Sequence, residues 1–222
     1  MALSQLEPQL IWKNFAALNA ALKKTSIQVV ERKSYPLGVK DLAPVLRGIK
    51  DQNPDAFIGI TYPPDTILAS RQAREVGLNP KFFYASVGTA FQLYKNVMQA
   101  NTEGVIGMGS WSVKTSPEAK AYFDAHVKKF NKEPDRWASG HAWAGLQILQ
   151  QAVEKAGLDR KALREHIAKN EFKTILGGIR FAGSENASIP GTVSQWQGSD
   201  FEVVWPKDRA TAQLNTAKPA WK

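Results

Sequence analysis

The chain has 222 residues, a hydrophobic content of 43% and no cysteine, which gives enough apolar material for a packed core and excludes disulfides, cysteine-ligated zinc and a cysteine nucleophile. The formal net charge is +9, but Lys and Arg are interspersed with Asp and Glu, which favours solvated helix faces over a nucleic-acid surface. No run approaches the ~20 apolar residues of a membrane span, and the start MALSQLEPQL lacks the basic and apolar regions of a signal peptide. We expect a globular chain without an export signal.

The first half of the chain predicts alternating helices and strands. Apolar spacings of three and four over residues 11–22 predict an amphipathic helix, and residues 27–30 predict a strand. Asp41 is expected to cap a helix over residues 42–49, and Asp65 a helix over residues 66–76 that ends at Gly77. Apolar runs at residues 56–61 and 82–84 predict buried strands. This βαβαβ order predicts an α/β fold with a doubly wound parallel sheet.

The second half begins in the same way and then changes. Residues 90–99 predict a helix and residues 105–109 a further strand. Ser116 is expected to cap a helix over residues 117–130, and residues 137–156 form a helix with apolar side chains on more than one face, which predicts protein on several sides of it. A short helix around residues 163–167 follows. The last strands are expected at residues 178–181, 192–197 and 201–205, the final two as an antiparallel hairpin, and the tail from Pro206 as irregular.

Catalytic and cofactor signatures are missing from the sequence. His126, His141 and His166 fall on expected helices without a metal-ligand spacing such as HExxH. The segment GMGSWS at residues 107–112 begins like a dinucleotide fingerprint but has serine at the third glycine position. Neither a GxSxG elbow nor a P-loop lysine occurs. We therefore expect no catalytic residue, no metal and no cofactor, so the sequence predicts a protein that is not an enzyme.

Polar and aromatic residues follow three of the expected strands. Tyr62 comes after the first, Ser86 and Thr89 after the second, and Trp111 after the third. Because parallel strands end at one edge of a sheet, and ligands bind at that edge, these residues are candidates for holding a small organic molecule. The alternative is that Tyr62 and Trp111 pack under loops and that Ser86 only begins a turn.

Seven short segments give the chain a resemblance to a known family. They are YPLGVKD (35–41), PDA (54–56), RQAREVGL (71–78), EGV (103–105), AVEKAG (152–157), GIRF (178–181) and QWQ (195–197). In this order the chain resembles the periplasmic solute-binding proteins of the branched-chain amino-acid type, which feed ABC transporters. The resemblance implies a type I periplasmic binding fold, in which two α/β lobes close on a small ligand, and it implies that Tyr62 contributes to the cleft.

One position departs from the pattern of that family. Amino-acid-binding members carry a carboxylate that pairs with the ligand ammonium where this sequence has Ser86. A buried ammonium without a charged partner is costly. The expected ligand is therefore an amino-acid-like compound, an aromatic or aliphatic carboxylate, or an amide.

The resemblance also implies how the chain is organised. Residues 1–112 correspond to the sheet region of the second lobe, residues 113–175 to helices that pack on the first lobe, and residues 176–222 to the return to the second lobe, with a terminal hairpin and tail. Most of the first lobe is expected to be absent, and the apolar helix faces that it would cover predict self-association. The other expected partners are ABC permease subunits, and the expected location is the periplasm.

Two other classes of function compete with solute binding. A ligand-sensing receptor or regulatory module can use the same two-lobed fold, but no helix-turn-helix or membrane segment accompanies it in this sequence. A hydrolase or transferase would require a nucleophile with a base within reach.

Overall fold

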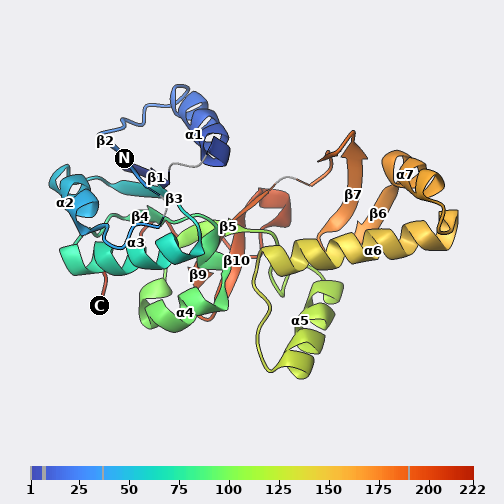
Figure 1. The fold of residues 1–222 in the computed structure, drawn as a ribbon. Coiled ribbons are helices and arrows are strands. Elements are labelled where there is room, and N and C mark those ends of the chain that lie inside the picture. The colour runs from blue at the N-terminus through green and yellow to red at the C-terminus, as the bar shows by residue number, and fades with distance from the viewer. Residues whose placement is uncertain (1, 7–8, 37, 190) are drawn as a thin grey trace. The chain divides into compact units, whose positions relative to one another are not determined.

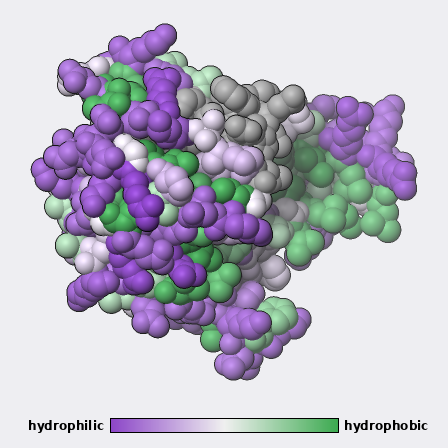
Figure 2. Space-filling view, turned by 60° about the vertical axis from the view of Figure 1, so that its left-hand side comes forward, coloured by the Kyte–Doolittle hydropathy of each residue, from purple (hydrophilic) through white to green (hydrophobic). Residues whose placement is uncertain are grey.

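The computed structural model describes residues 2–6, 9–36, 38–189 and 191–222, and it divides into two compact units. Unit 1 contains residues 1–108, 194–201 and 213–222, and unit 2 contains residues 109–193 and 202–212. In the part of the chain that is described, no helix is both long and apolar enough to cross a membrane. On the face drawn in Figure 2, hydrophilic side chains cover most of the surface and apolar groups show between them.

Unit 1 is a parallel α/β sheet with its helices (Figure 1). Strand β3 pairs in parallel with β1 and with β4, and β1 also pairs in parallel with β2. The elements in chain order are β1 (Ala2–Leu6), α1 (Gln9–Leu22), β2 (Glu31–Tyr35), α2 (Ala43–Asp51), β3 (Ala56–Ile60), α3 (Pro63–Val76), β4 (Phe82–Tyr84), η1 (Val87–Ala90), α4 (Gln92–Met98), η2 (Gln99–Thr102) and β5 (Ile106–Gly109). The α/β class predicted from the sequence is confirmed.

The strand order of the sheet is β10-β9-β5-β4-β3-β1-β2. Strand β2 lies on one side of β1, and strands β3, β4 and β5 follow one another on the other side, as in a doubly wound sheet. Strands β9 (Thr192–Gln197) and β10 (Asp200–Trp205) are neighbours at one edge, and each has residues in both units. The turn between them contains Gly198, whose φ of 62° suits glycine.

Unit 2 is built from three helices and a small sheet. Its elements are α5 (Pro117–Phe130), α6 (Ala138–Ala156), α7 (Arg160–Lys169), β6 (Glu171–Thr174), β7 (Gly177–Ala182) and β8 (Glu185–Asn186), with the short η3 (Lys207–Arg209). One side of α6 is buried through Ala144, Ile148 and Ala152, in a core cluster that also contains Trp111 and Phe172. The hydroxyl of Ser116 accepts a hydrogen bond from the Ala119 N–H, so the predicted cap of α5 is confirmed.

Three sequence predictions in unit 1 were wrong in detail. The strand expected at residues 27–30 lies instead at Glu31–Tyr35, where an edge strand with mostly exposed side chains gives little apolar signal. Helix α3 begins at Pro63, with Tyr62 and not Asp65 at the N-cap, because the two prolines need no hydrogen-bond partner in a first turn. The N-cap of α2 is Leu42, and the Asp41 carboxylate accepts from the Ala43 N–H at 2.9 Å.

Residues 213–222 of the C-terminal tail are irregular, as the sequence predicts, but they are held firmly to unit 1. The Lys218 backbone N–H donates to the Lys81 carbonyl at 2.8 Å, and the Trp221 indole donates to the Leu78 carbonyl at 2.8 Å. The Trp221 ring packs edge-on to Phe83 at 5.2 Å. Burial lowers the pKa of the Lys218 ammonium to about 8. Residues 213–222 are therefore part of the fold of unit 1, whereas residues 206–212 belong to unit 2 and contain the short helix η3 (Lys207–Arg209), which the prediction of an irregular tail missed.

Candidate functional site

The carboxyl ends of β3 and β4 form the edge that carries the candidate residues of unit 1. The two strands are parallel, with Ala56 opposite Phe82 and Ile58 opposite Tyr84. Their continuations, Tyr62 and Ser86, therefore leave the sheet at the same edge. We call this the β3–β4 edge.

Threonine hydroxyls tie the two strand ends together. The Thr66 hydroxyl lies 2.6 Å from the Thr61 hydroxyl and donates to the Tyr62 carbonyl at 2.9 Å. Both threonine hydroxyls also lie 3.2 Å from the Ala85 carbonyl. All these groups are buried or part-buried, so the hydrogen bonds fix the backbone that presents Tyr62 relative to the backbone that presents Ser86.

Tyr62 is the exposed member of the edge. Its backbone caps α3, and 40% of the residue is accessible to solvent. A phenol on a fixed backbone offers both an apolar ring and a hydroxyl to a ligand. The prolines that follow restrict the chain at this point, because they fix the φ angles of the first helical turn.

Ser86 has a backbone conformation that few serines adopt. Its φ is 51° and its ψ is −148°, at a position only 6% exposed. Such a backbone costs about 1–3 kcal/mol and persists only where the surroundings enforce it. The Ser86 carbonyl accepts from the Thr89 hydroxyl at 2.8 Å and from the Met108 N–H at 3.2 Å. Burial raises the pKa of the Tyr84 phenol, and a hydrogen bond with the Ser86 side chain acts in the opposite direction.

Thr89 is completely buried, and its polar groups already have partners. Its hydroxyl donates to Ser86, and its carbonyl accepts from the Trp196 indole at 3.0 Å. Gly107 lies close on the other side, since an added Cβ there would stand 1.8 Å from the Thr89 hydroxyl oxygen. These contacts support a positioning role for Thr89 in the turn that presents Ser86.

Trp111, the fourth candidate, belongs to unit 2. It is completely buried, and its indole N–H donates to the Asp135 carbonyl at 3.2 Å. Its ring packs against Tyr122 with centroids 5.5 Å apart, and the Arg136 guanidinium lies 5.2 Å from the ring centroid. The structure thus groups Tyr62, Ser86 and Thr89 in one unit and places Trp111 in the core of the other, and a ligand contact from Trp111 stays a prediction.

Two polar residues near the ends of strands were not among the sequence candidates. Tyr35 ends β2 and is 2% exposed, and Asp65 in the first turn of α3 is 6% exposed. Among the described residues, neither the Tyr35 hydroxyl nor Asp65 Oδ2 has a hydrogen-bond partner. Burial raises the pKa of Asp65, and burial together with the nearby Asp65 carboxylate raises that of Tyr35. The sequence signal available was the place of each residue close to the carboxyl end of a strand, Tyr35 as the last residue of β2 and Asp65 in the helix that follows β3.

The described residues contain no group of three or more His, Asp or Glu side chains arranged to hold a metal ion. Ring nitrogens of His126 and His141 lie within hydrogen-bond distance of nearby backbone carbonyls, at 2.9 and 2.8 Å. That of His166 lies 3.2 Å from the Asn170 side-chain amide. Each ring is therefore accounted for by a contact close in sequence.

A parallel α/β sheet with aromatic and hydroxyl groups at its carboxyl edge is the arrangement of small-molecule binding proteins. A family model described as periplasmic binding protein matches residues 12–200, and the chain belongs to this family. It is 26% identical over 212 residues to the Leu/Ile/Val-binding protein homolog 7 of Brucella suis biovar 1 (strain 1330), with 87% of this chain and 51% of that protein aligned. The chain spans about half the length of the curated relatives it matches.

Solved structures agree with the fold. A leucine binding protein from Thermotoga maritima superposes with a TM-score of 0.76 at 24% identity, over 93% of this chain and 61% of that one. An ABC-transporter solute binding protein from R. palustris, solved in complex with benzoate, gives a TM-score of 0.80 at 13% identity, over 91% and 57% of the two chains. These neighbours confirm the type I periplasmic binding fold, and the relatives named above are binding proteins.

Proposed function

We propose that this chain is the second-lobe portion of the solute-binding component of an ABC importer and that it contacts a small solute through the β3–β4 edge. The proposal rests on two residues at this edge. Tyr62 is 40% exposed to solvent, and Ser86 has a constrained backbone with a φ of 51°. Polar groups held in place by a rigid scaffold bind with little loss of conformational entropy. Within this proposal Tyr62 and Ser86 touch the ligand, Thr89 positions Ser86, and Trp111 is the candidate from unit 2.

The proposed ligand is a small carboxylate, an amide or an amino-acid-like compound. The relatives include Leu/Ile/Val-binding proteins, and one structural neighbour was solved in complex with benzoate. Ser86 offers a hydroxyl and not a charge, so it suits a ligand oxygen or amide better than an ammonium group. We therefore rank aromatic carboxylates and amides above zwitterionic amino acids.

The transport role rests on family membership. Members of this family bind solutes in the periplasm and deliver them to permease subunits. We therefore propose that this chain acts in the periplasm, that an ABC permease is its partner and that it has no catalytic activity. Residues 1–112 and 176–222 are proposed to form the second lobe, and residues 113–175 are proposed to contact the first lobe.

A thermal-shift titration tests the proposed site, because a ligand that binds the native state raises the melting temperature. The chain is titrated with leucine, benzoate and benzamide, and we expect a saturable rise for at least one of them. Tyr62→Ala and Ser86→Ala should reduce the rise, whereas Leu93→Ala should not, since Leu93 is an exposed side chain on α4 in the same unit. Equal shifts in all four proteins would refute the assignment of the edge.

Self-association is a separate part of the proposal. Three large apolar side chains of α6 are exposed: Trp143 at 43%, Leu146 at 59% and Leu149 at 47%. They lie between the positions that α6 buries in the core of unit 2, and an exposed apolar stripe favours association. Sedimentation should show a dimer or a larger species that dissociates in Leu146→Glu but not in Leu93→Glu. A monomer at all concentrations would contradict this part.

A further inference from the structure

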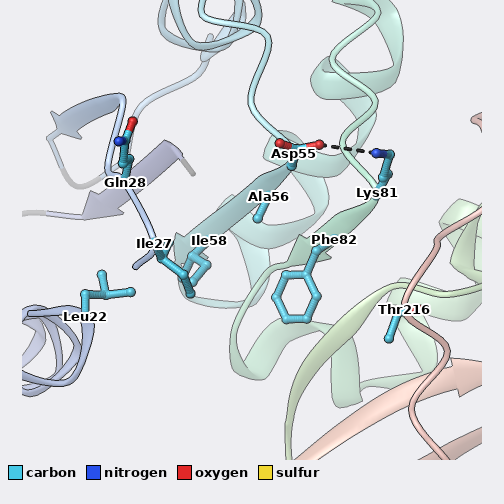
Figure 3. A pocket seen from close by; sticks show the side chains of 9 residues that line it. All are labelled: Leu22, Ile27, Gln28, Asp55, Ala56, Ile58, Lys81, Phe82 and Thr216. Carbon is cyan, nitrogen blue, oxygen red and sulfur yellow. Dashed lines mark hydrogen bonds and ion pairs between the residues drawn. The ribbon is translucent and has the colours of Figure 1, made fainter. Parts of the chain in front are cut away.

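A pocket opens in unit 1, away from the β3–β4 edge. It has a volume of about 610 Å³ and is lined by apolar side chains of Leu22, Ile27, Ile58 and Phe82, with Ala56 between them (Figure 3). Drug-sized ligands occupy pockets of about 300–1,000 Å³ with mostly apolar walls. Ala56 and Phe82 are the first residues of β3 and β4, whereas Tyr62 follows the last residue of β3. At ~3.3 Å per strand residue, Ala56 and Tyr62 are about 20 Å apart along the chain.

The pocket lies against one face of the sheet, on which the lining residues of β3 and β4 are only half-buried. Phe57 and Phe83, which are paired in register, are both completely buried and stack at 4.8 Å. The paired residues Ala56 and Phe82 point to the opposite face, where they remain half-buried, as does Ile58. Parallel sheets normally have both faces covered, so this face has apolar surface for a further apolar group.

Among the described residues that line the pocket, Leu22 and Ile27 come from the end of α1 and from the segment that follows it. Leu22 ends α1, and Ile27 lies in the connection, where 51% of it is accessible to solvent. An exposed isoleucine at the mouth of an apolar pocket gains buried area when a ligand fills the pocket. A ligand in the pocket would thus contact apolar side chains of the strands, Ile58 and Phe82, and apolar side chains of the preceding segment, Leu22 and Ile27.

Charge at the mouth is balanced. Lys81 Nζ lies 3.3 Å from Asp55 Oδ1 at one end of the pocket, and both side chains are largely exposed (Figure 3). A charged ligand would gain attraction from one of these groups and repulsion from the other, in a solvated setting where either is weak. Gln28 and Thr216 are the uncharged polar side chains of the lining.

We propose that this pocket is a second binding site of unit 1 that takes an uncharged aromatic molecule. The flat ring would lie on Ile58 and Phe82, with Ile27 above it, and a single polar atom would face Gln28 or Thr216 at the rim. The site differs from the proposed solute edge in place and in ligand class, so either can be present without the other.

The probe for this test is N-phenyl-1-naphthylamine, an uncharged aromatic amine whose fluorescence rises in apolar surroundings. Titration of the full chain should saturate at one probe per chain. Ile27→Asp puts a charge at the mouth, and Ala56→Phe fills the pocket floor, so each should weaken binding about tenfold or more. Leu93→Asp is the matched control, because Leu93 is 60% exposed and lies outside the pocket, and it should bind as the unaltered chain does.

Circular dichroism melts establish that each variant is folded. Should Ala56→Phe fail to fold, Ile27→Asp decides the result alone, since an exposed position tolerates the change. Probe binding that does not saturate, or that falls equally in Leu93→Asp and Ile27→Asp, would overturn the proposal. Loss of solute binding in Tyr62→Ala with unchanged probe binding is the pattern expected if both sites are present.

Discussion

Replacing Gly107 by alanine should destabilise unit 1 and disturb the β3–β4 edge. A Cβ at this position would stand 1.8 Å from the Thr89 hydroxyl oxygen, 2.5 Å from the Ser86 carbonyl oxygen and 2.9 Å from Thr89 Cβ. The Ser86 carbonyl belongs to the backbone, so the clash cannot be relieved by rotating one side chain. The turn that carries Ser86 and Thr89 must move away from β5.

The expected cost is about 1–3 kcal/mol, the range for overpacking in a well-packed interior. For a chain of this size, a loss of 1 kcal/mol lowers the melting temperature by about 2–4 °C, so the decrease should be about 2–12 °C. Ligand affinity at the β3–β4 edge should also fall, because Ser86 is displaced. Differential scanning calorimetry is the assay, since it measures the melting temperature and the unfolding enthalpy directly.

Gly145→Ala provides the matched control in α6. An added Cβ at Gly145 would have no heavy atom within 4 Å, and alanine in an exposed helix interior is favoured over glycine by about 0.5–1 kcal/mol. This variant should therefore melt at the same temperature or higher. If Gly107→Ala melts no lower than the unaltered chain, the packing described between β5 and the Ser86–Thr89 turn is wrong.

Three further changes test other parts of the structure. Thr66→Val removes the hydroxyl that bridges the Thr61 hydroxyl and two backbone carbonyls, and urea unfolding should show a loss of about 1–3 kcal/mol, whereas an unchanged midpoint would contradict the network. The folded pKa of Lys218 lies near 8 instead of 10.5, so the unfolded chain binds more protons between these values and stability should rise with pH across that window. Lys218→Met should abolish this rise in urea midpoints, and an identical pH dependence in both proteins would count against it. Arg136→Met removes the guanidinium of a residue that is 4% exposed, and this guanidinium lies 3.0 Å from a Glu133 carboxylate oxygen. The free energy of unfolding of unit 2 should fall by about 2–4 kcal/mol, and the tryptophan emission should change. Unaltered emission and stability would refute a stabilising role for Arg136.

The pattern of apolar residues predicted most of the fold because it reports burial directly. Helix α6 and strands β3 and β4 have long or dense apolar runs, and their positions were predicted within a few residues. Strand β2 was misplaced because it is an edge strand whose residues Arg32 to Ser34 are exposed, so its position depends on pairing with β1. Pairing of this kind has no local signature in a polar segment.

The candidate site was predicted through topology and not through side-chain chemistry. Parallel strands must end at one edge, and this places Tyr62 and Ser86 together without knowledge of any contact. Asp65 and Tyr35 were missed because what distinguishes them is burial without a hydrogen-bond partner among the described residues, a property of the folded chain. The packing role of Trp111 likewise depends on its contact with the Asp135 carbonyl, which lies beyond the reach of a local pattern.

The central claim is that the β3–β4 edge of unit 1 binds the solute, and amide chemical shifts in ¹H–¹⁵N NMR spectra test it most directly. The chain is titrated with the compound that gives the largest thermal shift among leucine, benzoate and benzamide. We expect saturable changes concentrated at residues 61, 62, 65, 66 and 85–90, and their loss in Tyr62→Ala. Changes centred on the amino ends of β3 and β4, or no saturable change with any of the three compounds, would contradict it.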